Sequence, residues 1–311
     1  TGSTALYLAR QAVESGSAEC VLALGFEQMR PGALGDIYTD RPSPFGEFND
    51  TCEQLVGNSH IPLALRYFGG AGKSHMDKYG TTMKDFAKIR AKASRHASKN
   101  PLALFKKEVS EEEVLNSPIM WPGVMTRLMA CPPTCGGAAA ILVSEKFAKK
   151  HNIDASVKIL AQSMTTDYES TFAEKDMMQL VGYDMTKEAA RDVYSQTGVD
   201  VQDVDVVELH DCFAHNELIT YEALGLCEEG EAQKFVHDGN NTFGGKFVTN
   251  PSGGLLSKGH PLGATGLAQC FELTQQLRGN AGEKQVEGAK TALQHNLGLG
   301  GACVTTLYQT R

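Results

Sequence analysis

Asn250-Pro-Ser-Gly-Gly-Leu-Leu-Ser-Lys-Gly-His-Pro-Leu-Gly-Ala-Thr-Gly266 is the stretch that decides how this 311-residue chain is interpreted. Its five glycines permit positive φ angles and a close approach of a ligand to the main chain. The loop presents one imidazole, His260, and Pro261 fixes the φ angle directly after it. Beyond it, an apolar stripe indicates a helix: Leu262, Leu267, Ala268, Phe271, Leu273 and Leu277. The spacing alone leaves two interpretations open, a histidine that takes part in chemistry and a structural turn.

The composition is that of a globular protein with room for a large core or two domains, since 41% of the residues are hydrophobic and 21% are charged. With a net charge of -8 and no basic stripe, the chain is not expected to bind nucleic acid. Its longest apolar run, residues 136–143, is too short to span a membrane. Eight scattered cysteines indicate reduced thiols in a reducing compartment. The chain starts with threonine instead of methionine, so we expect either processing or a piece of a longer protein.

Helices and buried strands alternate along most of the sequence, which predicts an α/β fold. Residues 1–15 form a predicted helix, and the all-apolar runs 20–25 and 136–143 are predicted strands buried on both faces. Further predicted strands cover residues 157–161, 204–209, 291–295 and 302–308, and further predicted helices cover residues 144–151, 187–197 and 217–224. We place a domain boundary near residue 154, which divides the chain into residues 1–153 and 154–311.

Between about residues 30 and 125 the periodic pattern weakens. A long irregular insertion in an α/β domain is often a lobe that covers the substrate. Within it, residues 83–99 combine a helical pattern with many lysines and arginines. We interpret them as the solvated face of a helix, in preference to an anion-binding surface.

Three loops at predicted strand ends carry the residues suited to chemistry: His210-Asp-Cys-Phe213, Gly259-His-Pro261 and Asn296-Leu-Gly-Leu-Gly-Gly301. Ligands of open α/β sheets bind where such loops gather. A thiol together with two imidazoles suits acyl transfer through a cysteine, because a nearby histidine raises the thiolate population. Imidazole and glycine N–H groups can also hold a developing oxyanion.

A metal site is the alternative for part of this set. His210, Cys212 and His215 could be ligands, but structural zinc takes four, and a second close pair is missing. The same objection applies to Cys131 and Cys135, so no metal is expected. Buried, inert thiols are expected at Cys227, Cys270 and Cys303.

Segments along the whole chain resemble the thiolase family, and most closely its sterol-carrier-protein-x type of 3-ketoacyl-CoA thiolase. They are residues 1–6, 71–80, 181–191, 208–213, 216–227 and 250–266. The His-Asp-Cys-Phe motif is the most specific of them, because most thiolases carry Asn-Glu-x-Phe there. Two segments depart from the family: residues 133–137 read Pro-Thr-Cys-Gly-Gly instead of Pro-Thr-Ser-Asp-Gly, and residues 118–128 fit poorly.

This resemblance implies thiolytic cleavage of a 3-ketoacyl-CoA to acetyl-CoA, or propanoyl-CoA, and a shortened acyl-CoA, with CoA as a substrate and no covalently bound cofactor. It implies that His260 activates a nucleophilic cysteine and contributes to an oxyanion site, and that His210 binds the thioester oxygen. Most thiolases carry a second acid/base cysteine in a Cys-x-Gly motif, where this chain has Gly298-Leu-Gly300. Cys212 would supply the missing thiol, and the backbone N–H of Gly300 would serve the second oxyanion site.

In the family the nucleophilic cysteine lies two residues before the segment that begins here with Thr1. The resemblance therefore implies that this cysteine and the opening strands of the first half are absent from the 311 residues. We expect the chain by itself to be inactive, and poorly soluble because of exposed strand edges.

The family fold consists of two similar βαβ-type halves packed as α-β-α-β-α layers, so the resemblance predicts that fold with an incomplete N-terminal half. It also implies a homodimer, a role in fatty-acid or sterol side-chain β-oxidation, and a peroxisomal location, with the mitochondrion as the alternative. A different class of function stays open: a non-catalytic acyl-CoA- or lipid-binding protein with this fold. A condensing enzyme of the ketoacyl-synthase kind is disfavoured by the His-Asp-Cys-Phe motif.

Overall fold

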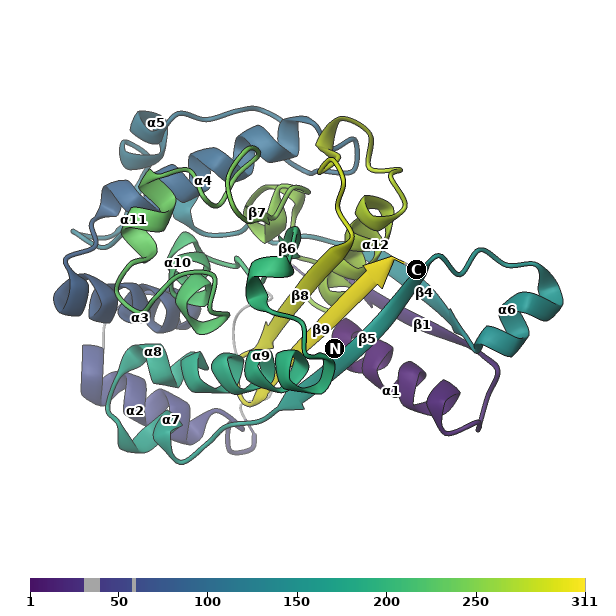
Figure 1. The fold of residues 1–311 in the computed structure, drawn as a ribbon. Helices are drawn as coiled ribbons and strands as arrows, with labels where there is room; N and C mark the ends of the chain where they lie inside the picture. The colour runs from purple at the N-terminus through teal and green to yellow at the C-terminus, as the bar shows by residue number, and fades with distance from the viewer. Residues whose placement is uncertain (31–39, 58–59, 311) are drawn as a thin grey trace.

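The computed structural model describes residues 1–30, 40–57 and 60–310, and its centre is a mixed five-stranded sheet (Figure 1). The strands lie in the order β5-β9-β8-β6-β7. Their bounds are Val157–Thr165 for β5, Val206–Glu208 for β6, Val248–Thr249 for β7, Thr291–Gly298 for β8 and Ala302–Thr310 for β9. β6 runs parallel to β7 and β8, whereas β9 is antiparallel to β5 and β8.

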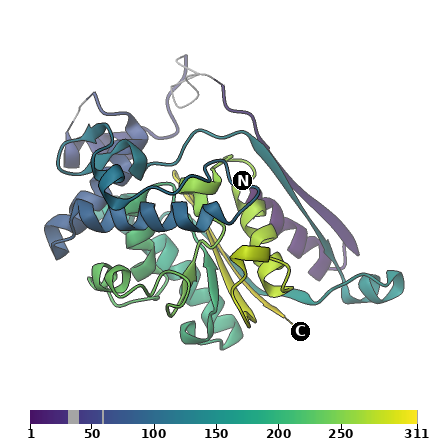
Figure 2. The same cartoon turned by 90° about the horizontal axis from the view of Figure 1, so that it is seen from above.

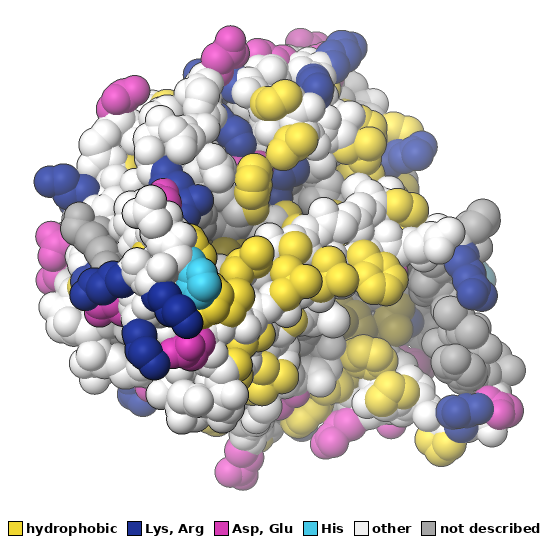
Figure 3. All heavy atoms as spheres, turned by 90° about the vertical axis from the view of Figure 1, so that its right-hand side faces the viewer, with side chains coloured by type: hydrophobic (Ala, Val, Ile, Leu, Met, Phe, Trp, Pro, Cys, Tyr) yellow, Lys and Arg dark blue, Asp and Glu magenta, His cyan; other side chains and the backbone are white. Residues whose placement is uncertain are grey.

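A second sheet contains β1 (Cys20–Glu27) and β4 (Gly136–Val143), which pair antiparallel with Leu22 opposite Ile141. The prediction that both strands are buried on both faces is wrong. Leu22, Phe26 and Ile141 are 61%, 73% and 67% exposed, and Figure 3 shows hydrophobic side chains in a stripe on the side that bears this sheet. The reason is that helices cover only one face, and within the described residues the two strands pair only with each other.

Two helices lie between the sheets, as Figure 2 shows from above. They are α1 (Gly2–Glu14) and α12 (Thr265–Leu277). Glycine permits their close contact, since a Cβ at Gly266 would lie 2.0 Å from the Ser3 Oγ and one at Gly25 would lie 2.2 Å from the Gly263 carbonyl oxygen. The N-terminal ends of both helices are therefore held together at one place.

Further helices cover the outer face of the large sheet and build the lobe. α9 (Tyr183–Thr197) packs on β5 and β9, and α10 (Ala214–Ala223) packs on α9 and on the lobe. The lobe holds α2 (Gly46–Val56), α3 (Leu63–Tyr79), α4 (Met83–Ser98), α5 (Glu111–Leu115) and a small hairpin of β2 (Ile119–Trp121) and β3 (Met125–Thr126). The remaining short helices are α6 (Glu145–His151), α7 (Ser170–Ala173), α8 (Met177–Leu180) and α11 (Ala232–His237).

The lobe differs from its prediction in one respect that bears on the site. α4 is a helix as predicted, and Lys84 and Arg95 are exposed as expected of a solvated face, but Arg90 and Lys92 are buried. Lys92 forms an ion pair with Glu217 of α10, and Arg90 donates a 2.8 Å hydrogen bond to Ser257. A buried cation is tolerated only when it is paired. The basic pattern of α4 therefore joins the lobe to the second half of the chain.

The other predicted elements are confirmed with small shifts of their bounds, the predicted strand 204–209 being the shorter β6. The predicted boundary near residue 154 falls in the loop between α6 and β5 and stays a prediction. Among the described helices, none is long and apolar enough to cross a membrane.

Candidate active site

The loops that carry His210 and Asn296 meet because their strands are neighbours. β6 and β8 are parallel, and Glu208 lies opposite Gln294, so both strands point their carboxyl ends the same way. The loop after residue 258 then brings His260 to this end, and the His210 and His260 rings meet edge to face with centroids 5.0 Å apart. The structure thus brings the two predicted imidazoles together.

His260 is almost completely buried, and threonine side chains contact both its main chain and its ring. Its backbone N–H donates to the Thr134 Oγ1 at 3.1 Å, and its Nδ1 lies 2.6 Å from the Thr265 Oγ1. Burial lowers the pKa of His260 to about 4, and the nearby charge of Lys258 acts in the same direction. The ring is therefore neutral at neutral pH and can accept a proton.

His210 is buried beside it. Its carbonyl oxygen accepts a 2.5 Å hydrogen bond from the Asn216 side chain, and its backbone N–H donates to the His295 Nδ1 at 3.4 Å. Burial lowers the pKa of His210 well below its ordinary value, as do the neighbouring His260 and His295, while a hydrogen bond with the Asn296 side chain opposes them. Its Nδ1 has no hydrogen-bond partner among the described residues, which leaves one ring nitrogen for a ligand.

Asp211 ties the two histidine loops to each other. Its carboxylate accepts the backbone N–H groups of Leu255 and Leu256 at 2.7 and 3.4 Å. These residues belong to η3 (Gly254–Lys258), a short π-helical turn that leads directly into His260. Burial first, and then the charge of Glu217, raises the pKa of Asp211 to about 8.

Cys212 lies beside the lobe segment that carries Cys131. The Cys212 carbonyl oxygen accepts the N–H of Cys131 at 2.9 Å, and Ala130 and Phe213 form an antiparallel bridge beside them. Burial, and next the neighbouring Cys131, raise the pKa of the Cys212 thiol well above its ordinary value. At neutral pH this sulfur carries its proton, so its chemistry is that of an acid and not of a resting thiolate.

Gly300 lies in the turn between β8 and β9, on the same hairpin as Asn296. Its φ angle is +86°, and a Cβ there would lie 2.5 Å from the Phe45 ring, so only glycine fits. No contact of its N–H identifies a role, and the predicted oxyanion function stays a prediction.

His215 does not join this group. Its Nε2 lies 2.9 Å from the Val124 carbonyl oxygen, and its ring lies against Phe86, tilted by 35° with centroids 4.0 Å apart. In the part of the chain that the structure describes, no three His, Cys, Asp or Glu side chains are placed to share a metal ion. The metal alternative for His210, Cys212 and His215 therefore has no support in the geometry.

The N-terminal ends of α1 and α12 both lie beside the loop that carries His260. A Cβ at Gly2 would lie 3.1 Å from the Gly263 carbonyl oxygen, which fixes the start of α1 beside the loop of His260. Helix N-termini carry partial positive charge, so this position favours a thiolate or an oxyanion.

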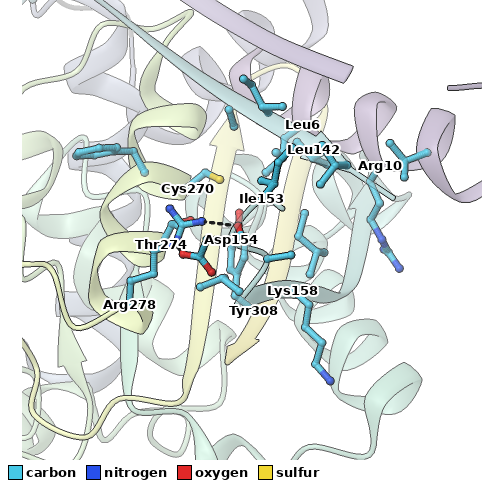
Figure 4. Close-up of a pocket in the computed structure, with 18 of the residues that line it drawn as sticks. Leu6, Arg10, Leu142, Ile153, Asp154, Lys158, Cys270, Thr274, Arg278 and Tyr308 are labelled. Carbon is cyan, nitrogen blue, oxygen red and sulfur yellow. Dashed lines mark hydrogen bonds and ion pairs between the residues drawn. The ribbon is translucent and has the colours of Figure 1, made fainter. Parts of the chain in front are cut away.

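A cavity of about 630 Å³ lies at the opposite ends of the same two helices (Figure 4). Its wall includes Leu6 of α1, Cys270 of α12 and strand β4, and none of the predicted site residues lines it. Two arginines that line this cavity form ion pairs, Arg10 with Glu14 and Arg278 with Asp154. Its size alone does not make it the active site, because the groups suited to catalysis lie elsewhere.

Sequence reasoning missed the residues that hold the imidazoles. Thr265 contacts His260, Asp211 fixes the preceding turn, and Asn296 contacts His210. The sequence offered a clue to two of these residues. Asp211 lies inside the His-Asp-Cys-Phe motif, and Asn296 is the first residue of the predicted loop 296–301. Thr265 looked like an ordinary residue of a helix start.

A mixed sheet and an antiparallel strand pair that enclose two helices, with paired histidines at the helix N-termini, define a thiolase-like α/β protein. The family described as thiolase C-terminal domain-like matches residues 166–309. The chain is 56% identical to sterol carrier protein 2 of Oryctolagus cuniculus over 311 residues, or 99% of this chain and 56% of that protein. It is 44% identical to the non-specific lipid-transfer protein-like 2 of Caenorhabditis elegans (99% and 76%) and 34% identical to an acetyl-CoA acetyltransferase of Methanothermobacter thermautotrophicus (99% and 77%). The chain belongs to the thiolase family, as its motifs predicted.

Solved structures confirm the predicted fold class. An Ltp2-ChsH2(DUF35) aldolase matches 99% of this chain and 77% of its own, with a TM-score of 0.81 at 21% identity. The dimeric peroxisomal thiolase of Saccharomyces cerevisiae (100% and 74%) gives 0.70 at 19% identity, and human mitochondrial 3-ketoacyl-CoA thiolase in complex with CoA (100% and 75%) gives 0.69 at 18%. The chain spans only about half the length of its sterol carrier protein 2 relatives, 56% for the rabbit protein.

Proposed function

We propose that this protein is a thiolase-type acyltransferase that cleaves a 3-ketoacyl-CoA into acetyl-CoA, or propanoyl-CoA, and a shortened acyl-CoA. The observation that carries the proposal is the edge-to-face pair of His210 and His260 at the joined N-termini of α1 and α12. Medium, long or branched acyl chains are the proposed substrates, in the β-oxidation of fatty acids or sterol side chains.

The first step uses His260 as a base. Its neutral ring takes the proton of a cysteine thiol, and the thiolate adds to the 3-keto carbon. The family places this cysteine two residues before Thr1. The start of α1, which is fixed beside the loop of His260, supports that position, because it offers its N-terminal partial positive charge to a thiolate.

The second step breaks the bond between the 2- and 3-carbons. The electron pair moves onto the thioester part as an enolate, whose oxygen His210 binds through the ring nitrogen that lacks a partner. The protonated thiol of Cys212 then gives its proton to the enolate carbon, and acetyl-CoA or propanoyl-CoA leaves. The shortened acyl group remains on the nucleophilic cysteine as a thioester.

In the third step, incoming CoA gives its thiol proton to the Cys212 thiolate and attacks the acyl thioester. The backbone N–H of Gly300 stabilises the tetrahedral oxyanion, and the cysteine sulfur leaves, taking the proton held by His260. CoA is thus a substrate, and the proposal involves no covalently bound cofactor and no metal.

The test compares three proteins: residues 1–311, the same chain extended N-terminally through the cysteine, and the extended chain with that cysteine changed to serine. We expect thiolytic turnover of acetoacetyl-CoA and of longer 3-ketoacyl-CoA only in the extended chain. Robust turnover by residues 1–311 would sink the proposed position of the nucleophile. Tight acyl-CoA binding without burst-phase acylation in the extended chain would favour the non-catalytic alternative.

We also propose that the whole protein is a homodimer in the peroxisome, with the mitochondrion as the alternative. The yeast structure matched above is a dimeric peroxisomal thiolase, which supports both parts. Light scattering of the full-length protein at several concentrations tests the dimer, and organelle fractionation tests the location. A monomer, or recovery in the cytosolic fraction, contradicts the respective part.

A further inference from the structure

Thr265, the first residue of α12, is buried and its hydroxyl has two neighbours. The Thr265 Oγ1 lies 2.6 Å from the His260 Nδ1 and 3.0 Å from the Pro261 carbonyl oxygen. A hydroxyl has one hydrogen to donate and lone pairs to accept with. It can therefore bond to both neighbours at once, or donate to one of them only.

The carbonyl oxygen of Pro261 does not depend on this hydroxyl. It already accepts the backbone N–H groups of Ala264 and Thr265 at 2.8 and 2.9 Å. A carbonyl oxygen has two lone pairs, so these two donors satisfy it. The hydroxyl hydrogen of Thr265 is consequently free to point either at Pro261 or at His260.

The direction of this hydrogen decides what the other ring nitrogen of His260 can do. When Thr265 donates to Nδ1, the proton of the neutral ring sits on Nε2, which is then a hydrogen-bond donor for an oxyanion. When Nδ1–H donates to Thr265, Nε2 of the neutral ring is a base, and after proton uptake both nitrogens are donors. A carboxylate in this place could only accept and would raise the pKa of the ring.

We propose that Thr265 is the positioning residue of His260: its hydroxyl accepts a hydrogen bond from Nδ1–H, which keeps the proton-accepting lone pair on Nε2, and this bond stays in place when the ring takes up a proton. The charged and titratable groups around the ring are His210 and Lys258. The charge of Lys258 opposes a positive charge on His260, so a partner that accepts from the imidazolium matters most during proton transfer. The role in proton transfer rests on the proposed function, whereas the state of the ring nitrogens does not.

The first experiment needs no activity. The full-length protein with ¹⁵N-labelled histidine is compared with Thr265→Val and Thr265→Ser by NMR of the ring nitrogens, and His260→Gln assigns the His260 signals. We expect Val, which keeps the shape but lacks the hydroxyl, to shift the Nδ1 resonance and the tautomer balance, and Ser to restore both. Unchanged ring-nitrogen shifts in Thr265→Val overturn the inference. Thr265→Ala is the second hydroxyl-free variant if Val does not fold.

The second experiment uses the extended, full-length protein. We expect Thr265→Val to lower kcat about 10- to 100-fold with little change in KM, and to shift the pH profile of kcat. Thr265→Ser should keep kcat within about threefold of wild type and leave the pH profile unchanged. Thr274→Val, farther along α12, is the matched control and should leave kcat unchanged. Equal kcat values in Val and Ser overturn the inference, whereas an inactive wild-type protein with the NMR signature intact overturns only the proposed function.

Discussion

The carboxylate of Asp211 and the backbone N–H of Leu255 lie 2.7 Å apart, and this contact couples the two loops that carry the histidines. Asp211 follows His210 directly, and Leu255 belongs to the turn that ends just before His260. The same carboxylate occupies the space that a side chain at Gly254 would need, since a Cβ there would lie 2.0 Å from it. The distance between the two imidazoles is therefore set through Asp211.

Removing this carboxylate should damage both stability and catalysis. In Asp211→Ala the buried N–H of Leu255 loses its acceptor, which costs about 1–3 kcal/mol of unfolding free energy, and His260 loses its fixed approach. Asp176→Ala is the matched control, because Asp176 accepts the N–H of Met178 at 2.9 Å at the start of α8, away from the histidines. Urea unfolding and kcat of the full-length protein are measured for both. A kcat loss as large in the control as in Asp211→Ala would contradict this coupling.

His260 should be needed for turnover but not for folding. We expect His260→Gln to lower kcat of the full-length protein about 10²–10⁴-fold, the usual contribution of a general base. Steady-state thiolysis together with a thermal unfolding curve provides the measurement, and His151→Gln, an exposed histidine at the end of α6, is the control. Activity within tenfold of wild type would assign the base to another residue.

The loss of stability in acid should be shared among buried histidines. Burial lowers the pKa of His96 to about 3, with Lys92 as the next cause. Such a group is neutral in the folded chain, while the unfolded chain takes up a proton as the pH falls through about 6.5, so stability is lost from about pH 7 downward. Asp211 acts in the opposite direction, since its raised pKa favours the folded state as the pH falls below about 8.

His96→Gln isolates one of these contributions. Glutamine can still donate to the Asn250 carbonyl oxygen that the His96 Nδ1 now contacts at 2.9 Å. We expect this variant to lose about 1–2 kcal/mol less unfolding free energy than wild type between pH 7 and pH 5. Urea midpoints at both pH values give the difference, and His151→Gln should follow wild type. Parallel curves for wild type and His96→Gln would show that His96 does not titrate as described.

The packing of α1 against α12 should depend on the absence of a side chain at Gly266. A Cβ there would lie 2.0 Å from the Ser3 Oγ and 2.4 Å from the Ser3 N, so one of the two helix N-termini must move. We expect Gly266→Ala to cost about 1–3 kcal/mol of unfolding free energy and to lower kcat of the full-length protein. Gly46→Ala is the control, because nothing lies within 4 Å of its Cβ and its φ angle is ordinary. A stable and fully active Gly266→Ala would mean that the helices need no such close contact.

The elements of the second half could be predicted because each carries a local signal. The run that becomes β9 is rich in apolar and β-branched residues, and a glycine-rich loop introduces α12. The lobe could not be predicted in the same way. The lysines and arginines of α4 look like a solvated surface, and only the position of Glu217 on a distant helix explains why Lys92 is buried. Long-range ion pairs leave no periodic trace in the sequence.

The motifs of the sequence predict the candidate residues of the site but not the residues that orient them. His210, Cys212 and His260 stand out because each lies in a glycine-rich or polar loop at a strand end or helix start. The residues that orient them are ordinary threonines, asparagines and aspartates, which are recognised only when distances such as 2.6 Å between the Thr265 Oγ1 and the His260 Nδ1 are known. Burial, which lowers the pKa of His260, is likewise a property of the packing.

The uncovered face of β1 should make residues 1–311 associate with themselves. Leu24 and Phe26 are 60% and 73% exposed beside Ile141, and apolar patches on a protein surface drive association. We expect the average molar mass of chain 1–311 in light scattering to rise with concentration. In the double variant Leu24→Lys, Phe26→Lys the mass should stay that of the monomer, with little change in the free energy of unfolding. Leu102→Lys is the control, because Leu102 is 65% exposed in the loop after α4 and away from this sheet. A wild-type chain that stays monodisperse at every concentration, or a control that is equally effective, would rule out this face as the cause.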